Sequence, residues 1–473
     1  MDLKLFMSLI ALAFAAVYVL HAAGAGDRGG ARARAIPGEK LLTLGFPGNF
    51  KVEFGKPSFG VERPRPLARA RGLKFRICGV VPGEGETVVY GLRTSGKGEP
   101  LEVWRATTRD GIEYGKSGMV YRTPDTGKPV HWMAPDVRLG AQGLVLLACQ
   151  MGKPPVKGHP FHAFGGNLDG TGWRKLNSRV IYRGQDSFGL TWNPKLGKFV
   201  NYQITYQPFP KRFPDNMPRV RRVLHIRTSP DGVRWTPGGS FGVAGPHLPA
   251  DQLITPDRND PPDTEFYHFA PIDLGEFWAG IMVKYVSQPK EIGKCGQFPH
   301  GPFLGCEWWV SADGFKWNRP FRETSSLDGL PLGFSYRLAQ PIAFGDELRW
   351  AAHGVVYALR RQRMFYTYSR ANAVLTTRTL ALSGKPISLE VDFVAAKRPE
   401  DERCSRGYLM AELLDGKGKA IPGFESSQCI FRGTGKTRLT LKWADRHLPP
   451  PGAGKRVRLR LYFREARLYS VTY

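Results

Sequence analysis

The stretches SPDGVRW (Ser229–Trp235) and SADGFKW (Ser311–Trp317) decide the fold of this 473-residue chain, because two weaker copies precede them. These copies are TTRDGIEY (Thr107–Tyr114) and NLDGTGW (Asn167–Trp173), and each follows an apolar, strand-like run. Asp-Gly favours a tight hairpin turn, because Gly accepts a positive φ and Asp hydrogen-bonds its own backbone. A motif repeated at long intervals indicates stacked or radially arranged units. We therefore interpret the four motifs as structural turns, with the aromatic residue as an anchor that packs between units.

The turns divide much of the chain into five units of runs rich in aromatic and β-branched residues. Five such units fit a β-propeller, which usually has about four to eight blades. We expect an all-β protein with a five-bladed β-propeller over residues 41–372. The fifth unit ends in RMFYTYSRAN (363–372), and the early strand Leu41–Phe54 is expected to complete this last blade. The first, innermost strands of the units are KFRICGVV (74–81), WMAPDVRL (132–139), QDSFGLTWNP (185–194), TEFYHFAPIDL (264–274) and SYRLAQPIAF (335–344).

The C-terminal part has a different pattern. Alternating apolar and polar runs such as YLMAELLDGKGKAIPGF (408–424) and KRVRLRLYFREARLYSVTY (455–473) are separated by turns. This pattern predicts a separate β-sandwich over residues 373–473, an ordinary size for a domain.

The N-terminus is typical of a secretory signal peptide. Lys4 precedes an apolar run from Leu5 to Leu20, and Ala23-Gly24-Ala25 offers a small-residue cleavage site. An uncleaved membrane anchor is the alternative, since the run is long for a signal. We expect a signal peptide over residues 1–25, a Gly/Arg-rich linker over 26–40, and a protein that is secreted or periplasmic.

The formal net charge of +27 points to polyanionic partners. We expect a carbohydrate partner, acidic or sulfated, although a generally basic proteome explains the charge equally well. Export argues against nucleic acid, and we expect a monomer with no membrane contact beyond the signal peptide. No Cys/His spacing resembles a structural zinc site, and a Ca²⁺ ion in the axis would lack a ligand motif, so we expect no cofactor.

Six cysteines are too few for a disulfide scaffold, but export permits bridges. Cys295 with Cys306, and Cys404 with Cys429, are the candidate pairs by proximity in sequence. Cys78 and Cys149 lie in apolar runs and are expected to be buried thiols.

Each innermost segment carries one charged residue, and these define the candidate site: Arg76, Asp136, Asp186, Glu265 and Arg337. Two carboxyl groups facing one pocket can cleave a glycosidic bond, one as the acid and the other as the nucleophile or base. Arginine suits a substrate carboxylate or sulfate. The alternative is a structural ion network that fills the axis.

Histidines and one aromatic residue near these segments are candidate sugar contacts: His131, Trp132, His268 and His353. Each could equally be a structural histidine or a core aromatic residue.

The five units and S-x-D-G-x-x-W turns resemble the secreted five-bladed propeller glycoside hydrolases of families 32 and 43, and the C-terminal module is similar to the β-sandwich that ends many of them. WMAPDV around Asp136 looks like the W-A-P-D segment of family 43. The resemblance implies that Glu265 is the general acid and that Asp186 modulates its pKa. Asp136 is the remaining candidate for base or nucleophile, because Arg76 stands near the position where the family has its base Asp.

Three alternatives remain open. FRICGVV followed by Gly91-Leu92-Arg93 resembles a segment of sialidases, which would make the protein a sialidase-like hydrolase. The missing Asp in the first unit favours a non-catalytic carbohydrate-binding propeller, and a propeller scaffold for protein contacts is the third reading.

Overall fold

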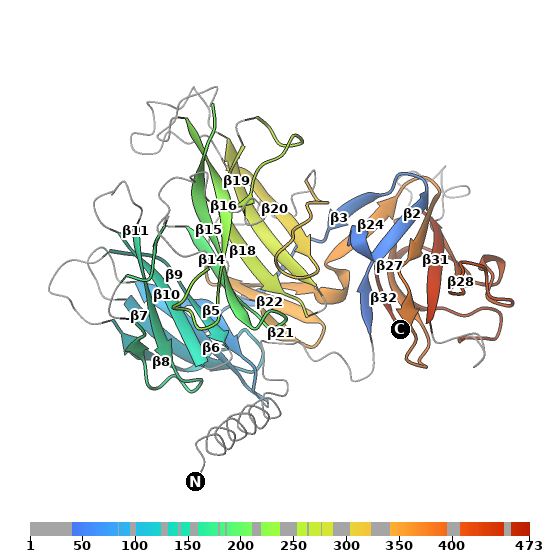
Figure 1. Ribbon diagram of the computed structural model, residues 1–473. Coiled ribbons are helices and arrows are strands. Elements are labelled where there is room, and N and C mark those ends of the chain that lie inside the picture. Colours follow the sequence, from blue (N-terminus) through green and yellow to red (C-terminus); the bar gives the residue numbers. More distant parts are fainter. Residues whose placement is uncertain are drawn as a thin grey trace, which may run out of the picture.

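The computed structural model describes residues 40–83, 85–94, 101–123, 131–140, 143–151, 159–177, 180–184, 187–210, 219–236, 253–262, 264–275, 277–286, 303–322, 341–394, 407–448 and 456–473. These residues form an all-β protein with seven sheets (Figure 1). Its described helical turns are the short 3-10 segments η1 (Pro47–Asn49), η4 (Arg361–Arg363) and η6 (Ser426–Gln428). No helix in the described ranges is both long and apolar enough to cross a membrane.

Five sheets of three to five strands follow one another along the chain. The first contains β5 (Arg76–Val81), β6 (Thr87–Thr94), β7 (Leu101–Thr108) and β8 (Gly115–Arg122). The second contains β9 (His131–Gly140), β10 (Gly143–Met151), β11 (His159–Gly166), β12 (Arg174–Lys175) and β13 (Arg183–Gly184). The third contains β14 (Phe188–Asn193), β15 (Lys198–Pro208), β16 (Val220–Ser229) and β17 (Leu253–Ile254). The fourth contains β18 (Thr264–Asp273), β19 (Trp278–Val286) and β20 (Phe303–Ser311), and the fifth β21 (Ile342–Phe344), β22 (Glu347–Ala352), β23 (Val355–Arg360) and β4 (Arg65–Arg69).

Two six-stranded sheets combine strands from both ends of the chain. Sheet A contains β1 (Leu41–Thr43), β3 (Ser58–Val61), β24 (Phe365–Ser369), β32 (Ala466–Thr472), β27 (Ser388–Phe393) and β30 (Gly435–Thr440). Sheet B contains β2 (Phe50–Phe54), β25 (Ala373–Thr377), β26 (Leu380–Ala381), β31 (Arg456–Arg464), β28 (Gly407–Leu414) and β29 (Ile430–Gly433). One apolar core, including Leu389, Leu461 and Trp443, contains residues from both sheets.

The five smaller sheets pack in cyclic order. Separate apolar cores join the first sheet to the second, the second to the third, the third to the fourth and the fourth to the fifth. A further core places Ile342 of the fifth sheet among residues of the first, such as Ile77 and Val89. The β4 strand strengthens this closure, because it lies directly before the first sheet in sequence yet pairs with β23 of the fifth.

The Asp-Gly motifs form the turns that the sequence predicts. In the third sheet, Asp231 Oδ1 accepts hydrogen bonds of 2.9 Å from the backbone N–H groups of Val233 and Arg234, and Gly232 has φ +79°. The Trp235 indole N–H donates back to Gly232 O at 2.8 Å. Asp110 and Asp313 repeat the same two backbone contacts in their own turns.

Each turn docks on the preceding sheet. The Tyr90 hydroxyl of the first sheet donates to Leu168 O in the turn of the second, at 2.7 Å. Gly232 lies against Val145 of the second sheet, and the Tyr202 hydroxyl of the third sheet donates to Gly314 O. The cycle closes where the Arg349 side chain of the fifth sheet donates to Asp110 O in the first. The turns therefore fix the order of the sheets as well as ending their strands.

Two strand placements expected from sequence are wrong. Leu41–Phe54 does not join the fifth small sheet, because β1 pairs with β32 and β2 with β25. The run 363–372 does not join it either, since β24 pairs with β3 and β32. The third and fourth strands of the fifth sheet are instead β23 and β4. An alternating pattern specifies that a segment pairs but not which of several sheet edges receives it.

The structure tests the expected state of two of the six cysteines. Cys78 is buried, as expected, whereas Cys429 is a buried free thiol, so its expected bridge to Cys404 is wrong. Burial raises the pKa of the Cys429 thiol to about 11. Cys295 and Cys404, and the side chains of Cys149 and Cys306, lie outside the described part of the structure.

Candidate functional site

The first strand of each small sheet is an edge strand of that sheet, and residues of all five such strands line one common cavity. We therefore call β5, β9, β14, β18 and β21 the inner strands. Consecutive members from β5 to β18 contact one another. We call the end at which these strands begin, marked by Arg76, Ser187 and Thr264, the strand-start end. The opposite end, marked by Val81, Asn193 and Asp273, is the strand-finish end.

At the strand-start end, a hydrogen bond joins two inner strands. Ser187 Oγ, immediately before β14, lies 3.1 Å from Nδ1 of His268 on β18. A β-bulge between Phe266 and His268 shifts the pairing of β18 with β19 at this point. Bulges re-aim side chains, and this one lies directly beside the histidine. His268 is half-buried, so this contact is a polar link between the third and fourth sheets.

Glu265, the expected general acid, is held in a buried ion pair. Its side chain is 0% exposed, and Oε2 accepts 2.7 Å and 3.2 Å hydrogen bonds from Nη1 and the backbone N–H of Arg222. The Arg222 guanidinium also lies over the rings of Tyr206 and Tyr267, at 5.6 Å and 6.0 Å from their centroids. The carboxylate is therefore shielded from solvent in this arrangement.

A second ionic network fixes the loop that leads into β18. Arg319 binds Asp260 of this loop at 2.5 Å and Glu307 of β20 at 2.8 Å, and Lys284 of β19 binds Glu307 at 2.6 Å. Burial is the largest single influence on Asp260 and raises its pKa, but the hydrogen bonds from Arg319 and the Asp257 backbone, together with the charges of Arg319 and Arg322, leave the pKa lowered. The network thus anchors the backbone four residues ahead of Thr264.

The remaining expected site residues are spread over this end or lie outside the described ranges. Arg76 is the first residue of β5 and is half-buried. Asp136 lies in β9 opposite Leu147, and His131 and Trp132 begin the same strand. The side chains of these three β9 residues, and the whole of Asp186 and Arg337, lie outside what the structure describes. His353 is exposed in the β22–β23 turn, with φ +50°.

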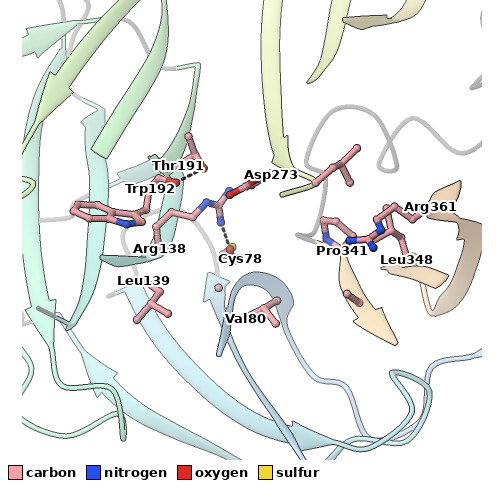
Figure 2. Close-up of a pocket in the computed structure, with 13 residues that line it drawn as sticks. Cys78, Val80, Arg138, Leu139, Thr191, Trp192, Asp273, Pro341, Leu348 and Arg361 are labelled. Carbon is pink, nitrogen blue, oxygen red and sulfur yellow. Dashed lines mark hydrogen bonds between the residues drawn. The ribbon is translucent and has the colours of Figure 1, made fainter. Parts of the chain in front are cut away.

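A cavity of about 90 Å³ lies at the other end of the inner strands (Figure 2). All five small sheets contribute to its wall, and none of the expected catalytic residues does. It can hold several waters, but it is smaller than the roughly 300–1,000 Å³ of typical ligand pockets. The charged residues of its wall are Arg138, Asp273 and Arg361.

Arg138 ties three inner strands together at this cavity. Its Nε donates to Leu190 O of the third sheet at 2.6 Å, and its Nη1 donates to Cys78 O of the first sheet. Its guanidinium points toward Asp273 of the fourth sheet in Figure 2, whereas Arg361 approaches from across the cavity. Inward-facing carbonyls of innermost strands have no further strand to pair with, so a planar guanidinium is a suitable donor for them.

Ser187, Arg138 and Asp273 were missed by the sequence reasoning. Ser187 directly follows the expected Asp186, and Arg138 lies two positions after the expected Asp136 in the sequence. These neighbourhoods were usable signals. Within the described ranges, no group of three His, Cys, Asp or Glu side chains could hold a metal ion.

No family model and no curated protein matches this chain. Similar solved structures include a family 117 glycoside hydrolase from Zobellia galactanivorans, with 12% identity, TM-score 0.34 and coverage of 61% of this chain and 75% of that chain. A fructofuranosidase from Schwanniomyces occidentalis has 9% identity, TM-score 0.36 and coverage of 87% and 97%. A thermostable family-43 glycoside hydrolase has 9% identity, TM-score 0.36 and coverage of 64% and 92%.

Proposed function

We propose that the protein is an exported glycoside hydrolase that acts on a polysaccharide at the strand-start end of its inner strands. The five small sheets would be the blades of a five-bladed β-propeller, and sheets A and B the layers of a β-sandwich. The cyclic packing of the five cores supports this architecture. Residues 1–25 would direct export, 26–40 would be a linker, and the mature protein would act as a monomer.

The observation that carries the proposal is that the Ser187–His268 contact joins two inner strands near their starts, where other chemically active side chains also lie along the chain. Glu265 and His268 lie on β18, Ser187 precedes β14, and Arg76 begins β5. In the proposed reaction Glu265 protonates the leaving oxygen, Asp186 orients it, and Asp136 is the base or nucleophile. Arg76 and Arg337 would bind an anionic group of the sugar.

The burial of Glu265 favours a second candidate, a carbohydrate-binding propeller without hydrolysis. A general acid must come within hydrogen-bond reach of the leaving oxygen. Glu265 achieves this only if its side chain leaves Arg222. If it stays there, the ion pair is structural and the strand-start end binds sugar without cleaving it.

The release of reducing ends from neutral, uronic and sulfated polysaccharides distinguishes the two candidates. The wild type is compared with Glu265→Gln and with Glu390→Gln, a control that disturbs another buried pair, Glu390–Arg363, at 2.9 Å. Hydrolysis lost only in Glu265→Gln supports the enzyme. Binding without product in all three proteins refutes hydrolysis of the tested polymers and supports the binding protein.

A further inference from the structure

A row of apolar side chains crosses one face of sheet B from edge to edge. The strand registers place Phe54 opposite Val374, Val374 opposite Tyr462, Tyr462 opposite Met410, and Met410 opposite Ile430. Phe54 is 62% exposed and Ile430 is 49% exposed, and the three residues between them are half-buried. We call these five residues the apolar row.

The apolar row is unusual for its position. Successive residues of a strand face opposite sides, and Leu375, Leu461 and Leu409, next to members of the row, lie in the core between sheets A and B. The outward face of such a sheet is normally polar. Four steps of about 4.8 Å between strands give the row a length of about 19 Å. Exposed apolar groups that line up in this way indicate a binding surface.

Basic side chains flank the apolar row on both sides. Arg464 lies opposite Tyr408, which lies opposite Arg432, and this line of residues is next to the row. On the other side Arg460 and Arg458 occupy the next outward positions of β31, about 6.7 Å apart.

The acidic groups among these strands are already paired. Glu412 accepts hydrogen bonds of 2.8 Å from Arg460 and from the Tyr462 hydroxyl. Glu53 binds Lys51 at 3.2 Å. The described acidic groups of these strands therefore do not offset Arg432 and Arg458, which give the face an excess of positive charge.

The face with the apolar row points away from the five small sheets. Sheet A connects to them, since Arg363 of η4 binds Glu390 of β27 and stacks over Tyr469 of β32. In Figure 1, β31 and β28 lie on the far side of the two six-stranded sheets. A long ligand can thus lie across the apolar row without contacting the strand-start end.

We propose that the apolar row and its flanking arginines bind an acidic polysaccharide chain. Aromatic and aliphatic side chains suit the apolar faces of sugar rings, and guanidinium groups bind carboxylate or sulfate in a bidentate manner. The row is one residue wide, which fits a ribbon-shaped chain rather than a broad membrane surface. A second copy of the same basic face would be repelled. The sugar chemistry of this site rests on the proposed function, but its role in binding does not require hydrolysis.

Binding of the full mature chain to polygalacturonate, dextran sulfate and neutral dextran tests the proposal. The variants are Phe54→Ser/Ile430→Ser and Arg432→Gln/Arg464→Gln. Each should weaken binding to the two acidic polymers at least tenfold, and added salt should weaken binding of the wild type because it screens exposed charges. The wild type should bind dextran far more weakly.

Matched control variants lie on the small sheets. Leu168→Ser/Leu196→Ser removes two side chains with 44% and 43% exposure, and Arg109→Gln/Arg174→Gln removes two exposed charges. Both controls should bind the acidic polymers as the wild type does. All variants are also tested for binding to phosphatidylserine vesicles and for molecular mass in solution.

Several results would overturn the proposal. Unchanged polymer binding by both test variants would do so, as would equal binding of dextran and polygalacturonate. If the test variants lost binding to vesicles but not to the polymers, the row would be a lipid-binding surface. If they lost only a dimer that the wild type forms, the row would bind a second copy of the chain. If the protein hydrolyses no polymer, the proposed binding role of the apolar row still stands. If it hydrolyses a polymer and the test variants bind as the wild type does, only the binding role of the row is refuted.

Discussion

The substitution Gly232→Ala tests whether the turns lock neighbouring sheets together. Gly232 has φ +79°, and a Cβ atom added there would lie 2.6 Å from Val145 Cγ1 of the second sheet. Left-handed backbone costs a non-glycine residue about 1–2 kcal/mol. Carbon atoms pack best at about 3.5–4.0 Å, and overpacking costs about 1–3 kcal/mol. We expect a total destabilisation of about 2–5 kcal/mol.

Gly275→Ala is the matched control. Gly275 has φ +88°, and an added Cβ atom would meet nothing within 4 Å. It should therefore show the backbone cost alone, about 1–2 kcal/mol. The difference between the two variants, about 1–3 kcal/mol, measures the contact between the turn and the second sheet.

Calorimetric Tm values, with tryptophan fluorescence as a second probe, measure the difference. A change of 1 kcal/mol shifts Tm by about 2–4 °C in domains of 150–250 residues. In a Val145→Ala background the penalty of Gly232→Ala should fall, with a coupling beyond the roughly 0.3–0.5 kcal/mol expected of independent sites. Equal Tm losses for Gly232→Ala and Gly275→Ala, with no coupling to Val145, would refute the docking of the turn.

Three further predictions follow from buried or paired charges. Burial raises the pKa of Asp231, but hydrogen bonds from the backbone N–H groups of Arg234 and Val233 help to bring the pKa below its usual value. The carboxylate therefore stabilises the fold fully above about pH 4, and this stabilisation is lost as the pH falls through the lower folded pKa. Asp231→Asn should therefore lower Tm more at pH 7 than at acidic pH, and an equal loss at both pH values would contradict this. Arg138→Met should destabilise by about 2–4 kcal/mol in denaturant titrations, since two inner strands lose a donor, and a neutral effect would show that these carbonyls need none. Arg222→Met should lower the free energy of unfolding by about 3–5 kcal/mol, because it leaves the buried Glu265 carboxylate without its cationic partner. The double variant Arg222→Met/Glu265→Gln should recover part of that loss, and additive losses from the two substitutions would disprove the pairing.

The Asp-Gly turns could be read directly from the sequence, because their chemistry is local. Asp231 bonds backbone groups two and three residues away, and Gly232 supplies the positive φ within the same turn. The first strands of the sheets were also recognisable, since β5, β14 and β18 lie within the apolar runs that predict them. Period-two patterns and turn residues are properties of neighbouring positions, so a sequence reveals them without knowledge of the rest of the chain.

The closing strands and the pairing of the charges were decided only by the tertiary structure. Leu41–Phe54 and β4 are both short, plausible edge strands, and the edges that accept them lie more than 250 residues away in sequence. The charge of Glu265 was visible in the sequence, but its pairing with Arg222 depends on two strands of different sheets. Apolar row members come from five separate strands whose registers align only in sheet B. The sequence by itself determined the local turns and strands, whereas their partners were chosen by long-range packing, which no local pattern encodes.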